Sequence, residues 1–161
     1  MNVQEVIDKV VVSEDYKFWL VENPAGFLAH VFVMTEIKDE YQVGYYDGTM
    51  MKTFLVSKTT VQGLPVDEIL QTEHGVLPLA VEEATVAFEE AERLAREQLV
   101  LHYPIELALK TFFIVQTLPQ PFGTVFNITF FCQSMRTVNI KMSAKDGTII
   151  KHTCESLVDK M

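Results

Sequence analysis

One short pattern occurs twice in this chain: Asp-Gly-Thr followed by two apolar residues and a lysine. It occupies residues 47–52 in YYDGTMMKT and residues 146–151 in KDGTIIKHT. Each copy lies between segments in which apolar and polar residues alternate, as they do in a strand with one buried face. Asp-Gly at such a place indicates a tight β-hairpin, because glycine adopts positive φ at little cost.

The residues before the two motifs also follow a common order. An aromatic-rich segment, FWLV or FFIV, is followed by Pro24 or Pro119. A long alternating segment then begins at Gly26 or Gly123 and runs through a polar turn to the motif. The distances from this glycine to the aspartate of the motif differ by only two residues. Order and spacing therefore predict a tandem repeat of a four-stranded antiparallel meander.

The side-chain pattern around the second motif predicts the register of its hairpin. A two-residue turn would pair Met142 with Lys151 and so place a charge opposite an apolar residue. A three-residue turn over 145–147 keeps the apolar side chains together, and register follows the buried face. The same turn length in the first hairpin places Val43 opposite Met51. For the second hairpin it predicts the pairs Met142–Ile150, Ile140–His152 and Val138–Cys154.

Two segments have the periodicity of helices. Between the two copies, six apolar residues recur at spacings of three and four, which predicts a long helix over 79–103 that Pro104 ends. These residues are Val81, Ala84, Phe88, Ala91, Ala95 and Leu99. Residues 2–11 carry apolar side chains on one side and predict a shorter helix. Residues 63–78 contain two glycines and two prolines and are predicted to form a connector.

These elements predict an α+β fold of two tandem repeats, 1–62 and 79–161. Each repeat would be a helix plus a four-stranded antiparallel meander, with the helices packed on one sheet face. The element order and the two DGT sequences resemble tandem PepSY-type modules and the related β-lactamase-inhibitor-like fold. Such modules are usually exported, whereas residues 1–15 lack a cationic start followed by an apolar stretch. The resemblance implies a binding or inhibitory module and transfers no functional residue.

The charge balance argues against several kinds of partner. The chain has 13 basic and 22 acidic residues, a formal net charge of −9 and no basic run. We therefore expect it to bind neither nucleic acid nor an anionic membrane, while a basic protein or peptide is compatible with its charge. Its apolar runs are far shorter than the roughly 20 residues of a membrane helix. Two cysteines suit a reducing compartment, so we expect a cytosolic protein.

Three residues of the second copy form the sharpest candidate site. Cys132, His152 and Cys154 are predicted on the apolar side of the sheet, where they could hold zinc or provide a reactive thiolate. Structural zinc sites usually need four ligands, and buried free cysteine is common, so two inert thiols are the favoured interpretation. The register also places a strand between the two cysteines, which predicts that they form no disulfide.

Two residues of the first copy are further candidates. His30 alternates with apolar residues and shares a face with Glu36, which would suit general-base chemistry, although a buried, hydrogen-bonded histidine is the simpler interpretation. Tyr46 points away from the face of Tyr41 and Tyr45, which are predicted to lie in the core. Tyr46 is therefore a candidate surface contact, since tyrosine is common at protein interfaces.

The sequence leaves three functions open. It has no Walker, Rossmann or nucleophile-elbow pattern, so no cofactor is expected. The first hypothesis is a non-catalytic protein-binding or inhibitory module that contacts a protein partner, or a second copy, through an exposed sheet edge. The second is a hotdog-like acyl-thioester enzyme with a single sheet around the long helix and a deep apolar pocket. The third is a small acidic secretion chaperone.

Overall fold

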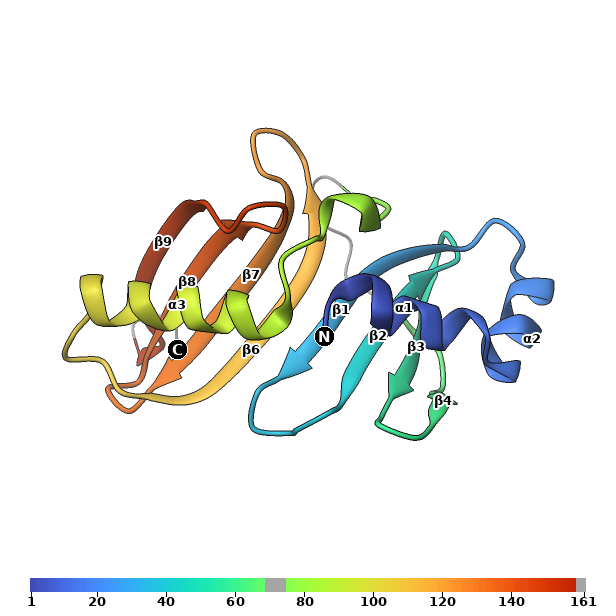
Figure 1. Cartoon of the computed structure of the whole chain (residues 1–161), viewed down its shortest axis with the longest axis horizontal. Helices are drawn as coiled ribbons and strands as arrows, with labels where there is room; N and C mark the ends of the chain where they lie inside the picture. The colour runs from blue at the N-terminus through green and yellow to red at the C-terminus, as the bar shows by residue number, and fades with distance from the viewer. Residues whose placement is uncertain (69–74, 159–161) are drawn as a thin grey trace.

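The computed structural model describes residues 1–68 and 75–158. In this part of the chain, α-helices α1 (Val3–Val11) and α3 (Phe88–His102) cross the same face of an antiparallel sheet (Figure 1). A second helix, α2 (Glu14–Glu22), packs beyond the end of α1, and a short 3₁₀ helix, η1 (Val81–Glu83), precedes α3. The strands are β1 (Phe27–Met34), β2 (Tyr41–Tyr46), β3 (Met50–Val56), β4 (Val61–Gly63), β5 (Asp67–Glu68), β6 (Ala108–Leu118), β7 (Gly123–Cys132), β8 (Arg136–Ser143) and β9 (Ile149–Ser156).

The described strands form a single antiparallel sheet. Their order across the sheet is β4-β3-β2-β1-β6-β7-β8-β9, and β5 pairs with β3. The two halves of the chain join where β1 pairs with β6, with Val31 opposite Val115. Both helices that cross the sheet begin near its middle and run outward in opposite directions (Figure 1). The protein is thus α+β with one continuous antiparallel sheet.

The predicted fold of two helix-plus-four-strand repeats is wrong. All described strands belong to one sheet, and FWLV, the predicted first strand of the first repeat, lies in α2. The Ser13 hydroxyl accepts a hydrogen bond from the N–H of Tyr16, and acidic residues occupy the first turn, as at a capped helix start. Its aromatic content is typical of a strand, but the helix buries Trp19, packs Tyr16 and Leu20 against the core and leaves Phe18 exposed.

The two Asp-Gly-Thr motifs consequently lie at non-equivalent places. The first connects β2 and β3, the second and third strands of its half, whereas the second connects β8 and β9, the third and fourth strands. Gly48 and Gly147 both have positive φ, 109° and 78°, as predicted for tight turns. The shared pattern therefore reflects the common backbone requirement of a turn.

The register of the second hairpin is confirmed over most of its length. Ile140 pairs with His152 and Val138 pairs with Cys154. A bulge between Lys141 and Met142 shifts the last pair, so that Met142 faces Ile149 where Ile150 was predicted.

The register predicted for the first hairpin is wrong. Met51 pairs with Tyr46, and Val43 pairs with Phe54. The Asp47 carboxylate accepts hydrogen bonds from the N–H groups of Thr49 and Met50, which shortens the turn between the strands.

Helix α3 begins nine residues later than the predicted start at residue 79. Backbone hydrogen bonds to the sheet hold the preceding segment, because Leu79 N–H bonds the Leu28 carbonyl and Val86 N–H bonds the Ala144 carbonyl. These bonds replace those that a helix would make within itself. The predicted N-terminal helix is confirmed, with a capping box of Asn2 and Glu5. Within the predicted connector 63–78, residues 69–74 lie outside the described residues, and β5 pairs with β3.

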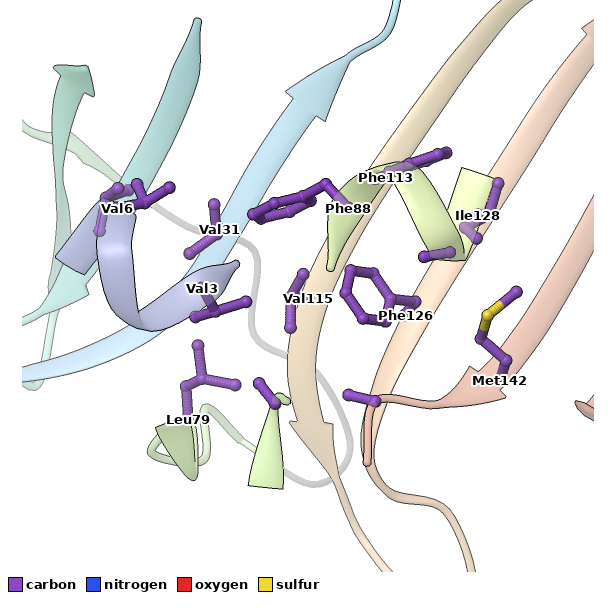
Figure 2. Packing of buried hydrophobic residues seen from close by; sticks show 14 of the residues in the cluster. Val3, Val6, Val31, Leu79, Phe88, Phe113, Val115, Phe126, Ile128 and Met142 are labelled. Atoms are coloured by element: carbon purple, nitrogen blue, oxygen red, sulfur yellow. The ribbon is translucent and has the colours of Figure 1, made fainter. Parts of the chain in front are cut away.

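The core is continuous across the junction of the two halves. Val31 and Val115 of the central strands are fully buried. Figure 2 shows that Val3 of α1, Phe88 of α3 and Leu79, which precedes η1, surround them. Side chains from both helices thus cover the central strand pair, so the halves share one core.

Replacing Gly147 by valine tests the second turn. Gly147 has a φ of 78°, and a Cβ added there would lie 2.6 Å from the Leu94 side chain of α3. We expect Gly147→Val to lower the free energy of unfolding by about 1–3 kcal/mol, because a β-branched residue resists this conformation. Denaturant unfolding measures the change, and Lys145→Ala, at an exposed position of the same turn, is the control. Equal stability of Gly147→Val and the parent protein would contradict this turn geometry.

Candidate functional site

The sequence-predicted candidates lie at three places in the fold. Cys132, His152 and Cys154 belong to β7 and β9, beside the C-terminal end of α3. His30 lies on β1, and Tyr46 lies at the first Asp-Gly turn. Of these residues, Cys154 lines a surface cavity together with polar side chains that include Glu106 and Arg136.

A buried carboxylate, Glu106, organises the region between α3 and the β7–β8 turn. Its side chain is only 3% exposed, and it lies 3.6 Å from the guanidinium of Arg136. The Ser134 hydroxyl donates a hydrogen bond to the same carboxylate. Buried carboxylates need such partners, so this cluster ties the segment after α3 to the β7–β8 turn. Sequence reasoning missed Glu106, although a single acid within the apolar run PIELAL is a signal that could have been followed.

The two cysteines are free and poorly suited to thiolate chemistry. Burial, together with the negative charge of Glu106, raises the pKa of Cys132 to about 11. Burial also raises the pKa of Cys154. Val138 lies between Cys154 and Phe130 in neighbouring strands, so a strand separates the cysteines as predicted, and no disulfide forms. Cys132 is buried, but Cys154 is partly exposed, which differs from the expectation that both would be buried.

His152 lies outside the cluster that Glu106 forms with Ser134 and Arg136. Its Nδ1 is 2.7 Å from the Tyr103 hydroxyl, and its ring stacks on His102 with 4.1 Å between centroids. Tyr103, Glu106 and Cys154 help to line a surface cavity of about 560 Å³. Among residues 1–68 and 75–158, no group of three or more His, Cys, Asp or Glu side chains could hold a metal ion. The contacts of His152 fasten the end of α3 to β9.

The burial and packing of His30 indicate a structural role. Burial lowers its pKa below the ordinary value of 6.5, so the neutral imidazole is favoured. The ring covers Gly44 of the neighbouring strand so closely that an added Cβ would overlap it. Glu36, its predicted acidic partner, accepts a hydrogen bond from the N–H of Thr111. His30 therefore packs over a glycine of the sheet, as aromatic side chains do beside strand glycines.

Tyr46 also has a role in its turn. Its hydroxyl donates a 2.7 Å hydrogen bond to the Gly48 carbonyl, and its ring contacts Phe27. Tyr45 is buried as predicted, and Tyr41 packs against Phe88 at the edge of the core. Tyr46 thus closes the first hairpin.

An apolar surface, which we call the apolar corner, extends over the same end of the molecule as Glu106. It is made by the last residues of α3, the following segment, the start of β6 and the β7–β8 turn. Backbone pairing of Gln133 with Leu107 places this turn against the segment. More than half of each side chain is exposed, and the members are Val100, Leu101, Ile105, Leu107, Leu109 and Met135. Ile105, at 87%, is the most exposed of them, and sequence reasoning did not single out any of the six.

Comparisons with known proteins support the fold. No family model and no curated protein matches the chain. A crystal structure of a protein described as a "putative lipoprotein" from Clostridium difficile 630 is similar, with a TM-score of 0.55 and 13% sequence identity. The match covers 88% of this chain and 91% of that one. At this identity the similarity concerns the fold alone. No helix in the described part of this chain is long and apolar enough to span a membrane.

Thiol titration tests the cysteine geometry. We expect an aromatic disulfide reagent at neutral pH to modify Cys132 very slowly in the native Cys154→Ser protein, because the thiol is buried and its pKa is raised. Unreduced wild-type protein should yield two thiols after denaturation. Rapid native modification of Cys132, or the absence of thiols in the denatured protein, would contradict the structure.

His30 should make stability depend on pH. The unfolded state binds more protons than the folded state below the ordinary pKa of 6.5, so the free energy of unfolding should fall as pH falls through that value. We expect a smaller decrease for His30→Asn between about pH 7.5 and about pH 5.5. Urea unfolding at both pH values measures the free energy of unfolding of the two proteins. Equal decreases in the free energy of unfolding of the two proteins would show that His30 is protonated equally in the folded and unfolded states.

Proposed function

We propose that the chain is a non-catalytic protein-binding module whose partner docks on the apolar corner. The observation that carries the proposal is that six large apolar residues in the end of α3, the segment after it, the start of β6 and the β7–β8 turn are each more than half exposed. Such patches mark interaction sites when they are contiguous and bordered by polar residues. Arg136, Glu97 and His102 lie beside this one.

The backbone under the apolar corner is held in place. The Ser134 hydroxyl donates a hydrogen bond to Glu106, and the Gln133 N–H donates one to the Leu107 carbonyl. The Tyr103 hydroxyl also contacts His152. These contacts come from three different elements and surround the segment that displays Ile105. A rigid surface loses less conformational freedom on binding, which favours affinity. The polar cluster therefore supports the corner as a binding surface, without a chemical step of its own.

The net charge suggests the character of the partner. With a formal charge of −9, the chain attracts a protein that surrounds its apolar contact surface with basic residues. An inhibitory module or a small secretion chaperone would be a special case of such binding. The predicted cytosolic location is part of the same proposal and rests on the sequence alone.

The packing under α3 gives the acyl-thioester alternative no support. Such an enzyme would hold an acyl chain between the long helix and the sheet. Here that face of α3 contributes Ala91, Ala95 and Leu99 to the core, where they are buried together with Phe126 and Phe130 of β7. Side chains thus occupy the space that the acyl chain would need.

Affinity capture with surface variants tests the proposed function. The immobilised wild-type protein should recover a partner from a lysate of its source, and Leu101→Ser/Ile105→Ser should lose most of it, because the apolar contact area is removed. Val12→Ser/Val21→Ser, at similarly exposed positions in the helical region of the other half, is the matched control and should keep the partner. Circular dichroism would verify that all variants fold. Equal recovery by both double variants would contradict the proposal.

A further inference from the structure

The two edges of the sheet differ in how well they could pair with another strand. At one edge β4 has only three residues, whereas at the other edge β9 has eight residues and contains no proline. Long edge strands of this kind offer unpaired backbone groups to another chain. β9 is therefore the edge that is suited to sheet extension.

The hydrogen bonds of β9 show which backbone groups face outward. Leu157 N–H donates to the Met135 carbonyl across the β8–β9 ladder, at 2.9 Å. Backbone groups alternate in direction along an antiparallel strand. The N–H groups of residues 151, 153 and 155 therefore point toward β8, and those of residues 152, 154 and 156 point toward the open edge.

The side chains of β9 have a charge pattern that is complementary to itself. Lys151, Thr153 and Glu155 alternate along the strand and so share one sheet face. A two-fold axis through Thr153 would place Lys151 of each copy opposite Glu155 of the other copy. With the axis at His152 or Cys154, Lys151 would instead face Thr153 or Leu157. Of these three axes, only the one at Thr153 places Lys151 opposite an acidic residue.

The position of Lys151 within one copy favours the same arrangement. Lys151 lies directly opposite Lys141 of β8, and like charges at such positions are unfavourable. Burial and the charge of Lys151 both lower the pKa of Lys141, and Glu155 acts in the opposite direction. A second Glu155 beside Lys151 would reduce the repulsion between the two lysines.

We propose that two copies of the chain pair through β9 in antiparallel orientation around a two-fold axis at Thr153, so that one sheet continues through both copies. His152 then exchanges backbone hydrogen bonds with Cys154 of the other copy. Lys151 and Glu155 of opposite copies form the closer, non-hydrogen-bonded pairs, in which side chains approach most nearly. An edge lysine normally discourages such pairing, but here each lysine meets an acid. The arrangement is isologous, as most homodimers are.

This dimer goes beyond the proposed function. The partner protein would dock on the apolar corner, whereas the second copy uses the edge of β9. A monomeric protein that still binds its partner would overturn only the dimer, and a dimer that captures nothing would overturn only the binding proposal.

Charge-reversal variants test the dimer. The molar mass measured by light scattering at micromolar concentrations should be about twice the 18.3 kDa of one chain. Lys151→Glu and Glu155→Lys should each be monomeric, because each places like charges opposite one another. Mixing the two variants should restore a dimer, since every pair is then of opposite charge. The double variant should also dimerise.

Two controls make the outcome decisive. Lys58→Glu changes the net charge equally at an exposed position of the β3–β4 turn and should remain dimeric. Circular dichroism should show that the single variants fold, as expected at exposed positions. A monomeric wild-type protein, or single variants that remain dimeric, would overturn the proposal.

Discussion

The pairing of β1 with β6 is the interaction on which the rest of this structure depends. It brings Val31 opposite Val115 at the middle of the sheet and makes one sheet from two halves of the chain. Val3 of α1 and Phe88 of α3 cover these strands from the same side (Figure 2). Without the pairing, each half would expose a long strand edge and part of its core. The position of both helices on one face therefore follows from this seam.

At the far end of the second half, a polar cluster has a comparable organising role. Glu106 is buried, and its partners come from the β7–β8 turn and the start of β8. Tyr103 and His102 connect the end of α3 with His152 of β9. These contacts fix the segment that carries the apolar corner and lies beside the open edge strand. The end of the molecule on which we propose that a partner docks is thus also held by side-chain contacts.

Cys132 and His30, which attracted attention in the sequence, have structural environments, while the surface on which we base the proposed function does not stand out in the sequence. Cysteine and histidine are chemically distinctive, but Cys132 is buried with a raised pKa and His30 covers Gly44. Exposed leucines and valines look the same in a sequence as buried ones. Whether Leu101 or Leu99 faces water depends on which side of α3 meets the sheet, and this is a property of tertiary packing.

The sequence by itself determined the local features: the N-terminal helix, the positive φ of both turn glycines, and the register from Val138–Cys154 to Ile140–His152. Each depends on residues close together in the chain or on the alternation of one hairpin. Tertiary structure alone decided that α3 begins at Phe88 and that β1 joins β6. In these cases local preferences differ by a few tenths to one kcal/mol, and contacts between distant segments outweigh them.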